Sequence, residues 1–211
     1  FPKPLQAVLD HDGMGIPTIK PWCEEGVQAR IERFKGHQVF ALATDVDAAG
    51  LVLLRKGTTP VVNKSVADLK KMKEMAGGIP LIVKGVLTVE GARKCVEAGA
   101  DAIVVSNHGG RVLDDALSTI EVLPEIAAAV KGQITILVDG GFRTGLDVFK
   151  ALALGADGVM IGRPLALAAV GGGKEGVRMM LDKIRSELRE TMIMSGCSTI
   201  AEITRSHVHI D

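Results

Sequence analysis

The chain has 211 residues, of which 47% are apolar and 24% are charged, and its 25 Lys and Arg residues balance 25 Asp and Glu residues. This composition indicates a globular, soluble protein rather than a disordered chain, and a net charge of zero gives no basis for nucleic-acid or membrane partners. The longest nearly uncharged run, from Pro164 to Gly173, is far shorter than the roughly 20 apolar residues that a membrane-spanning helix needs.

Short apolar segments alternate along the chain with segments of helical periodicity. The predicted strands cover residues 15–20, 38–45, 80–84, 102–106, 134–139 and 158–162. The predicted helices cover residues 24–35, 65–76, 88–98, 119–130, 144–154 and 174–194. This alternation predicts an α/β fold in which helical crossovers connect the strands of a parallel sheet.

A pattern that begins at Thr88 is repeated from Thr144 onward. Each threonine can cap the start of a helix, and a glycine, Gly99 or Gly155, stands where a left-handed residue ends that helix. A short apolar strand follows each glycine. The repeating unit is therefore a strand, a helix and a further strand.

Polar, glycine-rich segments follow the last four predicted strands one after another. An open doubly wound sheet has its glycine-rich turn after the first strand, whereas a (β/α)8 TIM barrel forms its site from the loops that follow its strands. We therefore predict a TIM barrel, with residues 1–211 as one domain. Because six strands are predicted and the sequence begins at Phe1 rather than Met, the barrel's first two strands are expected to lie upstream.

Two of these segments have the composition of phosphate-binding turns. They are Asp139-Gly140-Gly141-Phe142-Arg143 and Gly162-Arg163-Pro164. Glycine lets backbone N–H groups approach a phosphate, helix N-termini attract anions, and arginine adds charge-assisted hydrogen bonds. Either turn alone could be merely a tight turn, but their position after the last two strands of a barrel favours phosphate binding.

The strand at 102–106 leads into Ser106-Asn107-His108-Gly109-Gly110-Arg111. A histidine that titrates near neutral pH can accept a proton from a substrate, and a guanidinium can bind a carboxylate through two parallel hydrogen bonds. Lys84 stands at the end of the preceding strand, where it either faces the same site or extends from the rim into solvent. The pairing of His108 with Arg111 suits a substrate that carries an acid group.

Together, Lys84-Gly, Ser106-Asn-His-Gly-Gly-Arg, Asp139-Gly-Gly-Phe-Arg and Ile161-Gly-Arg-Pro resemble the FMN-dependent α-hydroxy acid dehydrogenase/oxidase family. That family includes glycolate oxidase, lactate oxidase and mandelate dehydrogenase. The resemblance implies oxidation of a small, lactate-like or glycolate-like 2-hydroxy acid to a 2-keto acid. It implies His108 as the catalytic base, Asp47 as the carboxylate that orients it, and Arg111 as the ligand of the substrate carboxylate.

The resemblance also implies a site for the cofactor FMN. Lys84 would lie against the N1 and O2 edge of the flavin, and Ser106 would line the same pocket. The ribityl chain and phosphate would be held by Asp139, Gly140, Gly141, Phe142, Arg143, Gly162 and Arg163.

Three features depart from the family pattern. Lys20 stands where the family has a tyrosine that meets the substrate, so it becomes the candidate substrate contact in a chain that has no tyrosine. Asp45 replaces a threonine that contacts the flavin, and an ion pair between Lys20 and Asp45 is the structural alternative. The loop at 47–64 is short for the family, and within it Arg55 is only a candidate for the second substrate arginine.

Two other functions stay open: an isomerase built on an FMN-binding barrel, and a barrel without redox chemistry that binds a sugar or nucleotide phosphate. Cys23, Cys95 and Cys197 lack metal-ligand spacing, so no metal site is expected. No signal peptide is recognisable, which predicts a cytoplasmic protein. We also expect a homo-oligomer.

Overall fold

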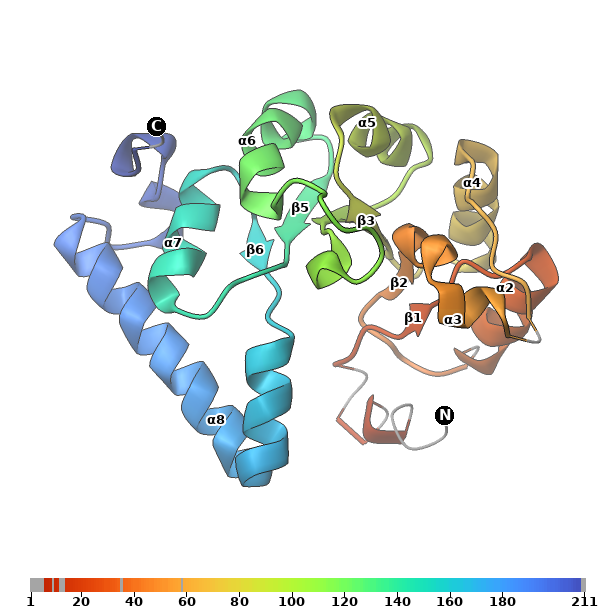
Figure 1. Cartoon of the computed structure of the whole chain (residues 1–211), viewed down its shortest axis with the longest axis horizontal. Coiled ribbons are helices and arrows are strands. Elements are labelled where there is room, and N and C mark those ends of the chain that lie inside the picture. The colour runs from red at the N-terminus through yellow and green to blue at the C-terminus, as the bar shows by residue number, and fades with distance from the viewer. Residues whose placement is uncertain (1–5, 9, 12–13, 35, 58, 210–211) are drawn as a thin grey trace.

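The computed structural model describes residues 6–8, 10–11, 14–34, 36–57 and 59–209 (Figure 1). Six strands form one parallel sheet in the order β1-β2-β3-β4-β5-β6. They are β1 (Thr18–Ile19), β2 (Leu42–Asp45), β3 (Leu81–Val86), β4 (Ala102–Val105), β5 (Thr135–Val138) and β6 (Gly158–Val159). Each strand pairs with its predecessor in the chain, which is the order of a barrel rather than of a doubly wound sheet. The expectation of two strands upstream rests partly on Phe1, which lies outside the described residues.

Helices connect the strands, as the sequence predicts. The α-helices are α2 (Glu24–Ile31), α3 (Val52–Arg55), α4 (Val66–Met75), α5 (Val89–Glu97), α6 (Thr119–Val130), α7 (Gly145–Ala153) and α8 (Arg163–Met194). Short 3-10 helices are η1 (Glu32–Phe34), η2 (Val46–Gly50), η3 (His108–Gly110), η4 (Ile200–Glu202) and η5 (Arg205–His207). Helices α4 to α7 lie on the outer side of the arc of strands (Figure 1).

Side chains along β2 to β5 alternate between two apolar clusters, because successive residues of a strand point to opposite faces. The outer cluster packs against the helices and contains Leu42, Leu81, Val83, Ile103, Val105, Ile136 and Val138. The inner cluster contains Ala43, Ile82, Ala102 and Val104, with Leu137 packed against it. The same alternation, continued to the carboxyl ends of the strands, directs Asp45, Lys84, Ser106 and Asp139 to the inner side.

The caps predicted from the repeated pattern are confirmed. Thr88 and Thr144 each accept a hydrogen bond from the backbone N–H of the third helical residue, at 3.0 and 3.1 Å. Gly99 and Gly155 have φ angles of 76° and 106°, in the left-handed region. Both helices therefore begin and end where the sequence pattern predicts.

The last helix begins earlier than predicted. The sequence predicts a helix from residue 174, whereas α8 begins at Arg163 and bends at Gly173, where φ is 56° and ψ is −142°. Pro164 in the first turn has a φ already suited to a helix, and the Leu-Ala run after it consists of strong helix formers. The four-residue helix α3, within the predicted loop at 47–64, is too short to show a periodic pattern.

Asp101 stabilises the amino-terminal end of the sheet. Its carboxylate accepts hydrogen bonds from the backbone N–H of Leu81 and from the Lys73 ammonium, both at 2.6 Å. Asp157 accepts a bond from the backbone N–H of Ile136 in the same way, at 2.8 Å. Burial acts to raise the pKa of Asp101, but the bonds from Lys73 and Leu81 outweigh it and hold the pKa below its ordinary value.

We predict that Asp101→Ala lowers the free energy of unfolding at pH 7 by roughly 1–2 kcal/mol, because the buried N–H of Leu81 loses its side-chain acceptor. The pKa of Asp101 is lower in the folded state, so its contribution is complete above the unfolded-state pKa of about 3.9 and is lost as the pH falls through the folded-state value. Urea unfolding of parent and variant over a series of acidic pH values tests this. A difference that stays constant to the acid end of the series contradicts the assignment.

Candidate active site

A cleft of about 430 Å³ opens at the carboxyl ends of strands β3 to β6. Its walls combine the predicted catalytic loop with both predicted phosphate turns. The lining residues are Lys84, His108, Gly109, Arg111, Asp139, Gly140, Gly141, Phe142, Arg143, Met160, Ile161, Gly162, Arg163, Pro164 and Ala166. Most of the predicted site residues are therefore brought together in one cleft. Met160, Ile161 and Ala166 are not among the predicted site residues. The first two lie in the predicted strand at 158–162 and Ala166 lies in α8, where single apolar residues carry no distinguishing signal.

Lys84 is the centre of a buried polar network. Its ammonium donates a hydrogen bond to Ser106 Oγ at 2.8 Å and lies 3.3 Å from Asp139 Oδ2. Ser106 Oγ also accepts the backbone N–H of His108 at 3.1 Å. The Lys84 side chain is only 17% exposed, so the alternative of a lysine that extends from the rim into solvent is wrong.

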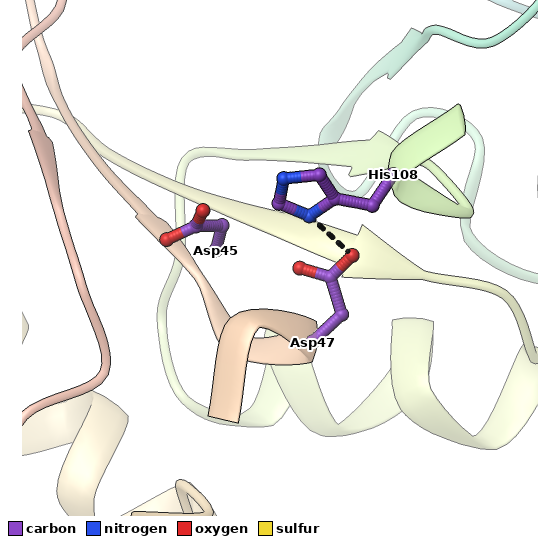
Figure 2. A group of neighbouring side chains, drawn as sticks. All are labelled: Asp45, Asp47 and His108. Atoms are coloured by element: carbon purple, nitrogen blue, oxygen red, sulfur yellow. Dashed lines mark hydrogen bonds and ion pairs between the residues drawn. The ribbon is translucent and has the colours of Figure 1, made fainter. Parts of the chain in front are cut away.

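His108 has a buried ring with a defined hydrogen-bond partner (Figure 2). Its Nδ1 lies 2.9 Å from Asp47 Oδ2, and only 7% of its side chain is exposed. An ionised carboxylate can only accept, so Nδ1 carries a proton in this pair, and the free lone pair of a neutral ring is then on Nε2. This is the tautomer that a base acting through Nε2 requires.

Backbone geometry fixes the loop that carries His108. His108 and Gly109 have φ angles of 57° and 68°, both in the left-handed region. Asn107 accepts the backbone N–H of Gly109 at 3.0 Å, and Arg111 Nε donates to the carbonyl oxygen of His108 at 3.1 Å. These hydrogen bonds hold the imidazole of His108 and the guanidinium of Arg111 on one short segment.

Gly85 makes room for Asp47. The register of β3 shifts between Lys84 and Val86, and Gly85 has a φ of 94°. A Cβ at this position would lie 2.5 Å from Asp47 Cγ, closer than side-chain atoms approach one another. A glycine within an apolar strand often marks a bulge or a close approach of another group, so Gly85 is the sequence signal for this contact.

The two glycine-rich turns differ in what their helices offer to an anion. Asp147, in the first turn of α7, accepts the backbone N–H groups of Arg143 and Thr144, each at 2.9 Å. The N-terminus of α7 is therefore already capped by a carboxylate, contrary to the expectation that it adds to a phosphate site. Helix α8 begins after Gly162, which has no side chain to cap it.

The glycines that line the cleft differ in how much space surrounds their Cα atoms. A Cβ at Gly141 or at Gly162 would meet nothing within 4 Å, so ligand atoms can approach the backbone there. A Cβ at Gly140 would lie 3.2 Å from Thr119 Oγ1, and one at Gly109 would lie 2.9 Å from Arg163 Nη2. Arg163 consequently faces the His108 loop across the cleft.

Lys20 does not line the cleft. Its ammonium forms an ion pair with Asp45 Oδ2 at 2.5 Å, as the structural alternative predicts. Arg55 lies exposed at the end of α3 and is also absent from the lining. Contacts of Lys20 and Arg55 with a substrate therefore stay predictions.

We predict that Lys84→Met destabilises the protein by about 3 kcal/mol, because it leaves the carboxylate of Asp139, which is only 18% exposed, without its cation. Adding Asp139→Asn to this variant removes the uncompensated charge and recovers part of the loss. Urea unfolding of the two single variants and the double variant measures the coupling. Strictly additive effects would show that the two side chains do not interact.

The chain belongs to the FMN-dependent dehydrogenase family, whose model matches residues 24–210. It is 53% identical over 133 residues to the peroxisomal (S)-2-hydroxyacid oxidase GLO3 of Arabidopsis thaliana, covering 63% of this chain and 37% of the relative. It is 49% identical over 144 residues to glycolate oxidase 3 of Oryza sativa subsp. indica, covering 68% of this chain and 39% of the relative. The aligned part thus spans well under half of these relatives' length.

The same family appears among solved structures. A mandelate oxidase variant bound to (S)-mandelic acid matches with a TM-score of 0.85 and 34% identity, covering 95% of this chain and 64% of that chain. A second structure of the same variant, with the monooxide FMN adduct, matches at 35% identity with the same TM-score, covering 95% of this chain and 65% of that chain. The match to about two thirds of such a chain agrees with the prediction that six strands represent part of a TIM barrel.

These comparisons support neither the predicted cytoplasmic location nor the predicted homo-oligomer. The Arabidopsis relatives GLO3 and GLO4 are named as peroxisomal proteins, so the predicted cytoplasmic location has no support. Among the helices of the described segments, none has both the length and the apolar character to cross a membrane. The predicted homo-oligomer stays a prediction.

Proposed function

We propose that the protein oxidises a small 2-hydroxy acid, of the lactate or glycolate type, to a 2-keto acid with FMN bound in the cleft. The observation that carries the proposal is the buried His108–Asp47 pair, which stands beside Arg111 and Lys84. This set supplies a base, a carboxylate ligand and a buried cation within a chain of the FMN-dependent dehydrogenase family.

The residues of the cleft fit FMN. The open backbone at Gly141 and Gly162 suits a phosphate, and the guanidinium groups of Arg143 and Arg163 would add charge-assisted hydrogen bonds. The Asp139 carboxylate would accept a hydrogen bond from a hydroxyl group of the ribityl chain. When bound, FMN supplies the acceptor for two electrons.

Arg111 and His108 would bind and orient the substrate between them. The Nε–H of Arg111 is already used on the carbonyl oxygen of His108, and its terminal N–H groups would bind the substrate carboxylate. Conversion of the alcohol to a ketone removes two electrons and two protons. His108 would take one of these protons at Nε2, and the other would leave with the two electrons, for which FMN is the acceptor. Asp47 would then stabilise the imidazolium through its bond to Nδ1.

Lys84 would hold positive charge beside the reacting groups. Its ammonium is fixed by Ser106 and Asp139, so little rearrangement is needed to offset negative charge that develops in the cleft. An FMN-barrel isomerase and a phosphate-binding barrel without redox chemistry are the other outcomes of the test. The pairing of His108 with Arg111 favours the oxidation.

Anaerobic spectroscopy of the purified protein separates these functions. We expect a yellow protein whose flavin absorbance bleaches on addition of lactate, glycolate or mandelate. Bound flavin that none of these acids bleaches would contradict the oxidation and support the isomerase. A colourless protein that takes up no added FMN would contradict both flavin-dependent functions.

His108→Ala should keep its flavin but lose substrate-dependent bleaching by at least about 100-fold, because the base is removed while the phosphate ligands remain. Stopped-flow reduction measures the rate. The matched control is His37→Ala, which truncates an exposed histidine away from the cleft and should leave the rate unchanged. An unchanged reduction rate in His108→Ala would contradict the role of His108 as base.

Arg143→Ala and Arg163→Ala should each weaken FMN affinity by about tenfold or more, because each removes a charged partner of the phosphate. Fluorescence titration of the flavin-free protein with FMN measures the affinity. Arg185→Ala is the control, since Arg185 is 81% exposed on α8. Equal affinities for all three variants would remove the argument for a phosphate site at these turns.

A further inference from the structure

A second carboxylate stands beside His108 in addition to that of Asp47. Asp45 is the last residue of β2, and its side chain is only 3% exposed. One polar side-chain atom each of Asp45, Asp47 and His108 lies within 4.8 Å of those of the other two. Figure 2 shows the Asp45 carboxylate beside the strand to the left of the ring and the Asp47 carboxylate below the ring, joined to it by the dashed line.

Among the described residues, only one of the two oxygens of the Asp45 carboxylate has a hydrogen-bond partner. Its Oδ2 accepts the Lys20 ammonium at 2.5 Å, whereas its buried Oδ1 has no hydrogen-bond partner among the described residues. Asp47 shows the same division, with Oδ2 on His108 Nδ1 and a buried Oδ1 that has no partner in the described part of the chain. Two buried carboxylates so close together repel each other unless a cation lies near both.

A proton taken up by His108 in the proposed reaction would place a positive charge beside these two carboxylates. Lys20, whose side chain is 30% exposed, is the cation paired with Asp45, and the Asp47 carboxylate is bonded to the ring itself. Arg111 and Arg163 also face the loop, but under the proposed function the substrate carboxylate and the FMN phosphate compensate them. Among the described residues, the charged groups around this site are Asp47 on the ring, Asp45 with its partner Lys20, Arg111 on the His108 carbonyl oxygen, Arg163 beside Gly109, and the Lys84–Asp139 pair, which Ser106 connects to the His108 backbone.

We propose that Asp45 is a positioning residue that stabilises the protonated form of His108 together with Asp47, and that Lys20 moderates this effect. The inference rests on the proposed function, in which His108 receives a proton from the substrate. Burial strengthens the interaction, because little solvent lies between the carboxylate and the ring and salt screens such a pair weakly. Asp45 acts through the ring of His108 and needs no contact with the substrate.

A purely structural role makes a different prediction. If the Lys20–Asp45 ion pair only joins the ends of β1 and β2, then its removal lowers stability without changing the protonation of His108. The two roles are therefore distinguished by titrating the His108 ring rather than by measuring activity alone.

The test is an NMR titration of protein with 15N-labelled histidine, in which the His108 signal is assigned by its loss in His108→Ala. Asp45→Asn should lower the pH at which the His108 ring takes up its proton by about one unit, and Asp45→Glu should restore most of the difference. Lys20→Met should shift the titration in the opposite direction, because Asp45 loses its counter-charge. Asp101→Asn, a lysine-paired aspartate at the other end of the sheet, should leave it unchanged.

Loss of packing would not shift the His108 titration in opposite directions in Asp45→Asn and Lys20→Met. The directions of the two shifts therefore distinguish an electrostatic effect from a structural one. The acid limb of the pH profile of kcat/KM should move with the NMR titration in each variant. A His108 titration that is the same in parent, Asp45→Asn and Lys20→Met overturns the inference. If the titration shifts as predicted but no 2-hydroxy acid is oxidised, the effect of Asp45 stands and the proposed function fails.

Discussion

The alternation of side chains along parallel strands is the constraint on which the site depends. Ala43, Ile82 and Leu137 pack on the inner side of the sheet, and two residues later the same side receives Asp45, Lys84 and Asp139. Parallel strands all end at the same edge, so these polar groups meet there. A shift of one residue in any strand would direct its polar residue into the outer helix-facing core instead.

The bulge at Gly85 allows Asp47 and His108 to meet at this edge of the sheet. Lys84 keeps its inward direction, and the missing side chain at Gly85 leaves space in which Asp47 reaches His108. The left-handed backbone at His108 then turns the ring toward Asp47, while the hydrogen bond from its own N–H to Ser106 anchors the loop to the Lys84 network. The His108 backbone and the Lys84 ammonium are thus linked through hydrogen bonds to one serine, Ser106.

Sequence patterns predicted the features that depend on local order, such as the strand-helix alternation, the caps at Thr88 and Thr144 and the clustering of the glycine-rich turns. The pattern of glycines and arginines alone does not indicate that the Asp147 carboxylate accepts the N–H groups of Arg143 and Thr144, although Asp147 is only three residues from Thr144. The sequence also leaves open whether Lys20 meets the substrate or pairs with Asp45, because that choice depends on the register of two strands rather than on either segment.

We propose that these strand ends form one site in which FMN and a 2-hydroxy acid react. A crystal structure of the protein with FMN and a 2-keto acid tests it most directly. We expect the flavin beside Lys84, the acid's carboxylate on Arg111 and its carbonyl oxygen facing Nε2 of His108. A keto acid bound away from Arg111, or a His108 ring turned away from Asp47 in the complex, would contradict the account.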